Sequence, residues 1–453
     1  MRSLPRFTAM LLLSSALAAC SFVPDYERPQ IATPSSFEGP QGQSGAISVA
    51  ADWWTSFNDL ELQQLMGEAL SKNLDIVAAL ARMDQAQGAL RSTNSSLLPQ
   101  VDASGGASRS DDSSRGVSKG ADGSLRISYA LDLWGLYRAQ SEASAADLRA
   151  STFDHEATVL LVQSSVATTY FAILNLNDRL AIANESLAAA RETLKLVQAR
   201  YDYGAISALD LAQQKTAVAN IEAGIPSLED QLNANRHALA ILLGRPPEGF
   251  TIATKPTSAL TLPVIAAGQP SELLERRPDI RRVEAQLQAA NADIGAARAA
   301  FFPNLSLSAS KSVDWLAGVG TSNGSSIAAS LLAPIFSGGQ LEGNLQVSKA
   351  RKAELAASYQ KTVLTAFGEV EDALSSADAN ARRDASLAVA ATEARRAYDL
   401  SQASYKAGAS DFTSVLDAQR SWLSARDSQA QARLAQYNAA VNLFIALGGG
   451  WKS

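Results

Sequence analysis

The chain has 453 residues, of which 47% are hydrophobic and only 6% aromatic, and 39 basic against 45 acidic residues give a net charge of −6. This length suggests more than one folding unit, and the acidic balance argues against a nucleic-acid partner attracted by bulk charge. A single cysteine excludes an intramolecular disulfide and a cysteine-based zinc site, and two histidines leave little for metal or acid–base chemistry. The phosphate-binding GxGxxG and GxxxxGK[ST] motifs and the zinc motif HExxH are absent, so we expect neither an enzyme nor a cofactor-binding protein.

The first 19 residues indicate a targeting segment. Two arginines precede an apolar run that is too short to span a bilayer, and small residues follow, which predicts a signal peptide at 1–19. The segment ends at Leu17-Ala18-Ala19-Cys20, which resembles a bacterial lipobox and predicts that Cys20 is lipidated and becomes the first mature residue. The alternative is a plain signal peptide with a chance cysteine.

The residue after the cysteine indicates the destination. Ser21 favours the outer membrane, because an aspartate there would suggest retention at the inner membrane. Loss of Arg2 and Arg6 with the signal peptide changes the net charge from −6 to −8. Several acyl chains acting together would anchor the chain stably.

After a lipidated N-terminal segment at 20–57, the chain is expected to contain two units of one design, repeat 1 at 58–270 and repeat 2 at 271–453. Each has a helix that ends before a proline, a strand pair, a very long helix, a glycine turn and a return helix. In repeat 1 the expected bounds are 74–96, the strand pair 97–133 (97–109 and 122–133), 136–203, 207–243 and an equatorial segment at 244–270. In repeat 2 they are 279–300, the strand pair 302–336 (302–314 and 326–336), 342–407 and 410–447. Arg109 to Gly123 and Trp315 to Ser325 are expected to be exposed loops.

A constant shift of 204 positions relates the two repeats. It superposes Gly204 on Gly408, since 408 − 204 = 204, together with the tyrosine three residues before each glycine. The same shift aligns four further pairs in the same order: Asp75 with Asp279, Pro99 with Pro303, Gly135 with Gly339, and Leu243-Gly244 with Leu447-Gly448. Five matches in register without a gap indicate an ancient duplication.

The strand segments alternate apolar and polar residues, as at 125–131 and 302–308. A barrel wall with one face in lipid and one in water requires this pattern, and the alternative is a soluble hairpin on a helical body. We expect no helix long and apolar enough to span lipid, and only helices or closed barrels cross a bilayer. Four strands cannot close a barrel, for which about eight are the minimum. Spanning strands therefore predict that several chains share one barrel, and three chains would supply twelve strands.

The long helices favour packing against several neighbours. At 1.5 Å per residue each would extend about 100 Å. Stretches such as 143–150 and 385–397 are rich in alanine and charge, and they lack the sustained leucine or isoleucine of a two-stranded coiled coil. The expected fold is therefore mainly α, with long antiparallel helices in a shared tube and a small transmembrane β part. The alternative for the long helices is a solvent-exposed helical hairpin.

Several segments carry a resemblance to a known family. The sequence Trp-Trp-Thr-Ser-Phe at 53–57 and the sequence Arg-Arg-Pro-Asp at 276–279 resemble the outer membrane factor, or TolC-like, family in its OprM/NodT-type lipoprotein branch. The two Tyr-x-x-Gly turns and Pro-Asp-Tyr at 24–26 after Cys20 are also similar. The resemblance covers essentially the whole mature chain of 434 residues, since 453 − 19 = 434.

The resemblance implies a homotrimeric channel in the outer membrane. A shared twelve-stranded β-barrel would continue into a helical barrel in the periplasm. A periplasmic adaptor (membrane fusion protein) and an inner-membrane transporter would be its partners. The implied function is a passive conduit for export of drugs, metals or other small molecules. The alternatives are the outer membrane channel of a type I protein secretion system and a non-conducting lipid-anchored periplasmic scaffold.

The resemblance also implies the site residues. The two Tyr-x-x-Gly turns, with Tyr201, Gly204 and Gly408, would lie at the periplasmic tip where an adaptor docks. Asp210 matches a tip aspartate that can bond Tyr405 from the other repeat, and Asp417 matches an aspartate that repeats around a threefold axis as a ring at the constriction. The sequence departs from the pattern where Ser410 and Ser414 replace a basic and an acidic residue. The closed-state network is therefore expected to be thinner or different.

Overall fold

The computed structural model describes residues 21–38, 50–113 and 116–450. The predicted signal peptide and Cys20 lie outside these residues. The chain divides into two compact units. Unit 1 comprises Met1–Ile31, Ala81–Asp154 and Asp279–Thr362, and unit 2 comprises Ala32–Leu80, His155–Pro278 and Val363–Ser453.

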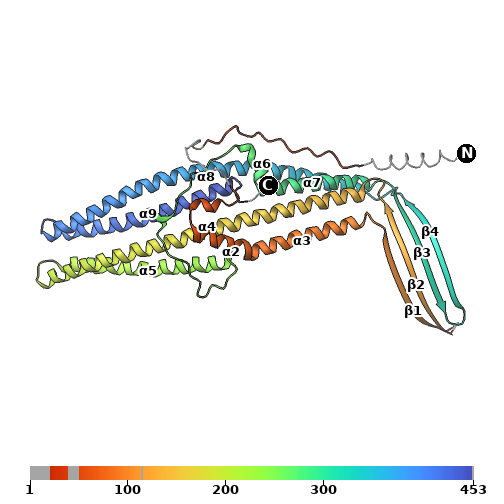
Figure 1. The fold of residues 1–453 in the computed structure, drawn as a ribbon, viewed down its shortest axis with the longest axis horizontal. Coiled ribbons are helices and arrows are strands. Elements are labelled where there is room, and N and C mark those ends of the chain that lie inside the picture. Colours follow the sequence, from red (N-terminus) through yellow and green to blue (C-terminus); the bar gives the residue numbers. More distant parts are fainter. Residues whose placement is uncertain (1–20, 39–49, 114–115, 451–453) are drawn as a thin grey trace. The chain divides into compact units, whose positions relative to one another are not determined.

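Unit 1 contains all the strands of the described residues, in one antiparallel sheet with the order β1-β2-β3-β4 (Figure 1). The strands are β1 (Gln100–Asp112), β2 (Gly116–Leu131), β3 (Asn304–Leu316) and β4 (Gly320–Leu332). Strand β2 from the first repeat pairs with β3 from the second, so the duplicated halves share one sheet.

The expected exposed loops between the strands are wrong, because most of their residues extend the strands. Arg109 pairs with Lys119 and Ser110 with Ser118, well inside the loop expected at 109–123. The Ser110 and Ser118 hydroxyl oxygens lie 2.7 Å apart. In the second hairpin only three residues separate β3 from β4, and Gly318 there has a φ of +85°, which glycine adopts without strain. Polar serine and glycine residues therefore continue the strands, because the ladder bonds come from the backbone.

The helices of unit 1 pack through small side chains. These are α7 (Pro278–Ala299) and portions of α3 (Leu74–Ser95), α4 (Leu136–Asp202) and α8 (Gln340–Lys406). Ala143 and Ala146 of α4 are buried against Ala289 and Ala292 of α7. Alanine at these positions lets the two helix backbones approach closely, as the alanine-rich composition predicts.

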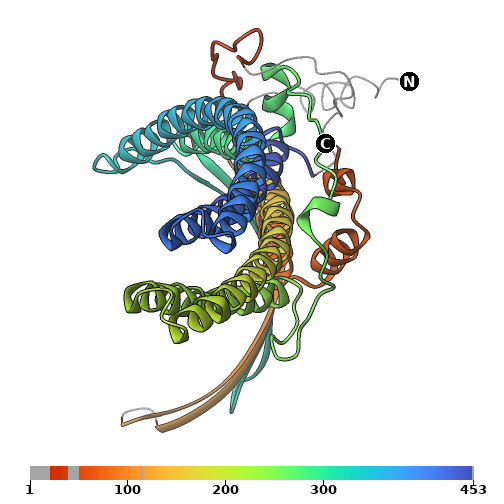
Figure 2. The same cartoon turned by 90° about the vertical axis from the view of Figure 1, so that its left-hand side faces the viewer.

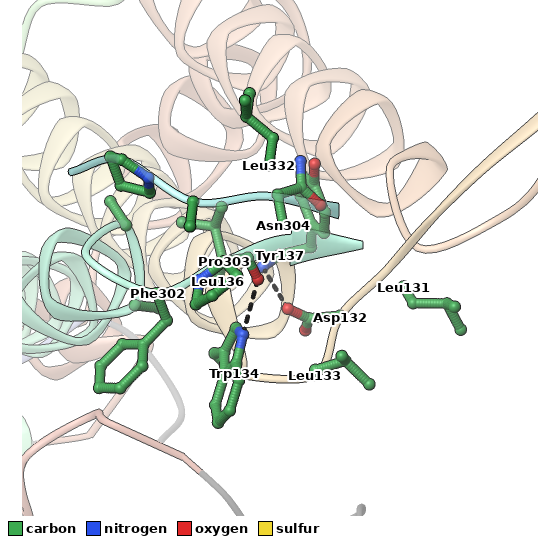
Figure 3. Close-up of a pocket in the computed structure, with 14 residues that line it drawn as sticks. Leu131, Asp132, Leu133, Trp134, Leu136, Tyr137, Phe302, Pro303, Asn304 and Leu332 are labelled. Carbon is green, nitrogen blue, oxygen red and sulfur yellow. Dashed lines mark hydrogen bonds between the residues drawn. The ribbon is translucent and has the colours of Figure 1, made fainter. Parts of the chain in front are cut away.

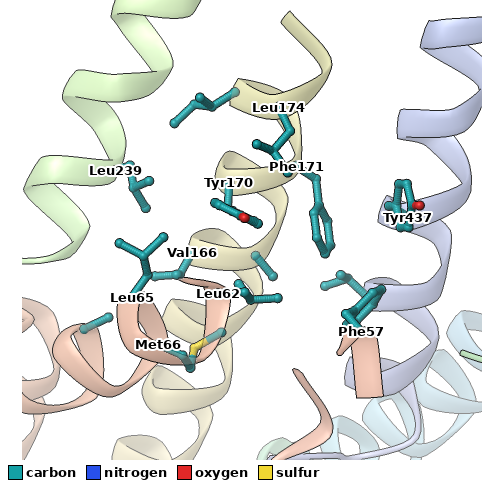
Figure 4. Packing of buried hydrophobic residues seen from close by; sticks show 14 of the residues in the cluster. Phe57, Leu62, Leu65, Met66, Val166, Tyr170, Phe171, Leu174, Leu239 and Tyr437 are labelled. Atoms are coloured by element: carbon teal, nitrogen blue, oxygen red, sulfur yellow. The ribbon is translucent and has the colours of Figure 1, made fainter. Parts of the chain in front are cut away.

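Unit 2 is helical and contains the larger apolar core. It holds η2 (Trp53–Phe57), α2 (Leu60–Lys72), α5 (Ala208–Leu242), η3 (Thr257–Ala259), η4 (Pro270–Glu272), α6 (Leu273–Arg276), α9 (Phe412–Ala446) and the remaining portions of α3, α4 and α8. Phe57, Tyr170, Phe171 and Tyr437 pack together in this core (Figure 4). At one end of unit 2 the hairpins α4–α5 and α8–α9 lie side by side, as Figure 2 shows.

The expectation that no helix is long and apolar enough to span a membrane is wrong. Judged by its length and composition alone, α4 meets both requirements. Its most apolar stretch has no charged residue between Glu156 and Asp178. Half of the most apolar window is buried inside the chain. There Val166, Tyr170 and Phe171 belong to the unit 2 core. Packing within the chain therefore accounts for the buried half of this stretch.

The two repeats make corresponding contacts at their boundaries, between residues that are related by the 204-residue shift. The Asn73 side chain donates to the Leu242 carbonyl at 2.8 Å, and Arg277 donates to the Ala446 carbonyl at 3.2 Å. Here 277 − 73 and 446 − 242 both equal 204. Different side chains therefore perform the same task in the two repeats, since each donates to a carbonyl near the end of its return helix.

Asp59 is a buried acidic residue and the N-cap of α2. Its side chain is almost fully buried and accepts bonds from the Tyr170 hydroxyl at 2.7 Å and from the backbone amide of Leu62 at 3.2 Å. Lys255 lies 2.6 Å away as its ion-pair partner. Burial alone would raise the pKa of Asp59, but the bonds from Lys255, Tyr170 and Leu62 outweigh it and hold the pKa below its usual value.

We expect Asp59→Asn to lower the free energy of unfolding by about 2 kcal/mol at pH 7, because charge-assisted bonds in a buried site are lost. A depressed native pKa gives stabilisation that is complete above the unfolded value of about 3.9 and is lost as pH falls through the native pKa. The difference in the free energy of unfolding between wild type and Asp59→Asn should therefore narrow only as the pH falls below about 3.9. Thermal unfolding followed by circular dichroism from pH 7 to pH 3 measures it. Asp52→Asn is the control, because Asp52 precedes η2 without a side-chain cap bond, and an equal loss there would contradict the argument.

Candidate channel wall and turn residues

The sheet of unit 1 has one apolar face. Val101, Ile127, Ala309 and Ile327 lie opposite one another across all four strands. Ile327 is 90% exposed in the chain. The neighbouring rows on this face include Leu125, Tyr129, Leu131, Leu305, Leu307, Leu331, Val313 and Trp315, with Lys311 among them. Toward the first hairpin turn the same face carries the charged residues Arg109, Asp111 and Lys119. An exposed face of this composition is suited to lipid contact.

The opposite face of the sheet is polar. The Ser104 and Ser124 hydroxyl oxygens lie 2.8 Å apart across β1 and β2, and those of Ser310 and Ser326 lie 2.8 Å apart across β3 and β4. The rows of this face also carry Asp102, Arg126, Asp122, Asp314, Ser128, Ser308, Ser312 and Ser322. Such a surface is suited to water, as the alternation in the sequence predicts.

The outer strands of the sheet have no partner within the described residues. Strand β1 pairs only with β2, and β4 pairs only with β3. Each outer strand has 13 residues. Their outer backbone groups are thus available to pair with another strand.

Two Gly-x-Ser-x-Gly sequences match the nucleophile elbow of hydrolases, but their positions do not. The sequences at 116–120 and 320–324 lie in β2 and β4, whereas the elbow is a sharp turn between a strand and a helix. Ser118 is bonded across the hairpin to Ser110. They are strand residues, related by the 204-residue shift.

The two Tyr-x-x-Gly segments form identical helix ends in unit 2. Gly204 and Gly408 have φ values of +68° and +73°, in the left-handed region where glycine is favoured. Gly204 donates its amide to the Tyr201 carbonyl at 2.8 Å, and Gly408 donates to the Tyr405 carbonyl at 3.1 Å. The next amide also donates back into each helix, from Ala205 to the Arg200 carbonyl and from Ala409 to the Ser404 carbonyl. Each helix end is therefore a Schellman motif. Tyr201 is exposed beside the first turn.

The predicted bond between Asp210 and Tyr405 is absent from the structure. The Asp210 carboxylate accepts from the Ser207 amide at 3.1 Å and the Ser207 hydroxyl at 2.8 Å, as part of a capping box at the start of α5. The Tyr405 hydroxyl is buried with no hydrogen-bond partner. A partner three residues away satisfies Asp210 at little conformational cost, which explains the difference.

Arg200 makes the contact to Tyr405 that sequence reasoning missed. Its guanidinium lies over the Tyr405 ring, 4.4 Å from the centroid, and donates to the Lys406 carbonyl at 3.1 Å. This cation–π contact connects the end of α4 to the end of α8. The two helices belong to different repeats, so no local pattern in the sequence indicates the pair.

A second contact between the repeats lies beside Trp422 of α9. The Trp422 side chain is buried, stacks on Tyr398 with ring centroids 5.1 Å apart, and has the Arg395 guanidinium 4.4 Å from its centroid. Glu185 of α4 forms ion pairs with Arg395 and with Arg426. These charges and rings hold α4, α8 and α9 together near their turns.

Asp417 is an exposed acid near the start of α9. Its side chain is 78% exposed, and the nearest basic group is Arg420 at 3.8 Å on the same helix. The structure thus leaves this carboxylate unshielded in a single chain. Of the two departing serines, Ser410 has a buried hydroxyl without a partner, and the Ser414 amide donates to the Asp411 carbonyl at 3.2 Å.

Metal chemistry finds no support in the described part of the chain. Within residues 21–38, 50–113 and 116–450, no group of three or more His, Cys, Asp or Glu side chains could hold a metal ion.

Comparison with known proteins places these features in a family. The family model described as outer membrane efflux protein matches residues 65–245 and 269–449, and both bounds differ by 204. Pyoverdine export outer membrane protein OpmQ of Pseudomonas aeruginosa is 38% identical over 467 residues, covering 100% of this chain and 98% of that protein. Toluene efflux pump outer membrane protein TtgC of Pseudomonas putida is 33% identical over 462 residues, covering 96% and 93%.

The solved structures agree with the sequence comparison. The open state of the MtrE outer membrane channel of Neisseria gonorrhoeae superposes with a TM-score of 0.84 at 30% identity, covering 95% of this chain and 98% of that one. The chain belongs to the outer membrane efflux protein family, and it is an outer membrane channel of a tripartite efflux system.

Proposed function

We propose that three copies of this chain form one conduit by closing their sheets into a shared twelve-stranded barrel. The single observation that carries the proposal is the four-stranded sheet with an apolar face, a polar face and two unpaired outer strands. Four strands are too few to enclose a pore, and β4 of one copy beside β1 of the next satisfies the outer backbone groups of both. The serine-rich face then lines the water-filled lumen.

The conduit is proposed to be passive and to work with two partners. A periplasmic adaptor docks at the turns of Gly204 and Gly408, and an inner-membrane transporter supplies the energy. Both glycine turns leave open space where a side chain would stand, since an added Cβ meets nothing within 4 Å in the chain. A lipid on Cys20 is proposed to add an anchor to the outer membrane.

The proposed cargo is a small molecule. The relatives named above export pyoverdine and toluene, which supports small organic molecules in preference to whole proteins. The polar wall is mainly acidic, with Asp102, Asp122 and Asp314 against Arg126, and so favours cations over anions. A non-conducting periplasmic scaffold would not require a sheet with one lipid-facing and one water-facing side.

The test is the oligomeric state and conductance of the purified full chain. We expect native mass spectrometry in detergent to give a trimer, and planar bilayers containing it to show discrete channel openings. A monomer that leaves bilayers electrically sealed would overturn the proposal. Transport of a fluorescent siderophore, set against a folded protein of similar charge, would then separate small-molecule export from protein secretion.

Asp417 is proposed to form a ring of three carboxylates at the narrow periplasmic end, which would bind cations and slow anions. We expect Asp417→Asn to lower the ratio of cation to anion permeability by about threefold or more at 0.1 M salt. The change should be smaller at 1 M salt, where the screening length is about 3 Å. Single-channel reversal potentials measure it, and Asp417→Glu, which keeps the charge, is the control. Identical selectivity in all three proteins would dispose of the ring.

The gate is proposed to rest on Arg200 and Tyr405, with Asp210 completing the capping box of α5. The supporting observations are the cation–π contact of Arg200 on Tyr405 and the satisfied carboxylate of Asp210. A double-mutant cycle on closed-state conductance distinguishes the two pairs: coupling between 200 and 405 supports the proposal, and coupling between 210 and 405 contradicts it.

A further inference from the structure

The first described residues form an extended strap, defined as Phe22–Arg28, along helix α7 in unit 1. At one end Arg28 forms a two-bonded ion pair with Glu284, at 2.7 and 2.9 Å. Further along, Asn291 donates to the Pro24 carbonyl at 2.6 Å, and Arg298 donates to the Phe22 carbonyl at 3.3 Å. The strap therefore runs antiparallel to α7, and its N-terminal end lies where α7 leads into β3.

Gly295 provides the notch that seats the strap. A Cβ added at Gly295 would lie 2.7 Å from the Val23 Cα and 2.8 Å from its amide nitrogen. Backbone atoms cannot yield as the end of a flexible side chain can, so only glycine at 295 allows this close approach. Tyr26 packs on Leu287 and Leu355 one step further along the strap.

The strap ends at an apolar cavity at the base of the sheet. The Phe22 ring stacks on Phe302 with centroids 4.6 Å apart, and Phe302 stacks on Trp134 at 5.0 Å. Phe302 and Trp134 line a cavity of about 370 Å³, where Trp134 donates its indole N–H to the Pro303 carbonyl at 2.8 Å (Figure 3). The other apolar lining residues are Leu131, Leu133, Leu136, Ala299, Ala300, Leu332, Ala333 and Pro334.

We propose that this cavity receives an acyl chain carried by Cys20 of the same polypeptide. The inference rests on the lipidation of Cys20 included in the proposed function. Cys20 precedes Phe22 by two residues in the sequence, and two residues of chain span at most about 7 Å, so a lipid on Cys20 is attached within that reach of the Phe22 backbone. The cavity wall is mainly apolar, as a hydrocarbon chain requires.

The tether favours this occupant over others. A chain held a few ångströms from the cavity has a high effective concentration there, which a free membrane lipid does not have. The seated chain would fix the anchor at the base of the strands, and the strap would transmit its position to α7.

The test uses the full chain produced in cells that are fed a fatty acid with a terminal diazirine. After illumination of the isolated trimer, we expect intramolecular cross-links from the Cys20 lipid to peptides containing 131–137 or 299–304. Gly295→Ala, which unseats the strap, should lower their yield several-fold. Gly88→Ala is the matched control, because an added Cβ there meets nothing within 4 Å.

Three further outcomes decide against the proposal. Cross-links mainly to membrane lipid, or to a second copy of the chain, would overturn the proposal. A cross-link yield that is unchanged in Gly295→Ala would also overturn it. A second arm carries the diazirine on a phospholipid and uses a chain with Cys20→Ala behind an ordinary signal peptide. If the phospholipid labels the cavity of the Cys20→Ala chain as strongly as the Cys20 lipid labels the wild-type cavity, the occupant is membrane lipid. The mass of the N-terminal peptide and the conductance of the same samples report separately whether lipidation or channel function has failed.

Discussion

An arginine in place of Ile327 is expected to prevent the chain from assembling in the membrane. Ile327 lies in the middle of β4 on the apolar face, and 90% of its surface is exposed in the single chain. A charged side chain facing lipid near the bilayer centre costs about 2–4 kcal/mol, and a trimer meets that cost three times. The measurement is the fraction of chain recovered as heat-resistant trimer in outer membranes, which we expect to fall by at least tenfold.

The neighbouring residue provides a matched control. Ala328 lies on the polar face of the same outer strand, in the row of Ser128 and Ser308. Ala328→Arg adds the same charge and the same bulk, but the side chain faces water. We expect nearly normal trimer yield and a changed conductance. Equal losses in the two variants would mean that β4 is sensitive to any arginine, and the assignment of its faces would fail.

The strands show how far sequence patterning reaches. The segment 125–131 alternates clearly, because one face carries Leu125, Ile127 and Tyr129 and the other carries Arg126, Ser128 and Ala130. The outer halves of the hairpins, such as 109–123, carry polar residues on both faces, for example Ser118 on one and Lys119 on the other, so hydrophobicity reveals no period there. Their pairing depends on backbone hydrogen bonds and on the register set by the inner halves.

The turn residues show the difference between local and distant signals. Glycine three residues after a tyrosine at the end of a long helix predicts a left-handed cap, and both caps are found. The sequence Ser207-x-x-Asp210 also predicts a capping box locally, and that bond outcompetes a longer one to Tyr405. The contact of Arg200 with Tyr405 depends on how two separate hairpins pack, which the pattern of neither one determines.

The glycines that follow α5 and α9 should be the least replaceable of the four repeat-related helix ends. Gly448 has a φ of +74°, and a Cβ built on it would lie 2.6 Å from the Arg276 carbonyl oxygen. Gly244 has the same conformation, and its added Cβ would lie 2.6 Å from the Lys72 carbonyl oxygen. In both cases the obstacle is backbone, so a methyl group must displace the chain at the boundary between a return helix and the helix before it.

We expect Gly448→Ala and Gly244→Ala each to lower the free energy of unfolding by about 3–5 kcal/mol, as the sum of left-handed strain and overpacking. Gly408→Ala and Gly204→Ala separate the two causes, because these turns have similar φ values with nothing within 4 Å of the added carbon. They should lose only about 1–2 kcal/mol, the strain alone. Thermal unfolding of the four detergent-purified variants measures the difference. If all four lose equally, the close approach of Lys72 and Arg276 has no energetic consequence, and the repeat boundaries are held by other contacts.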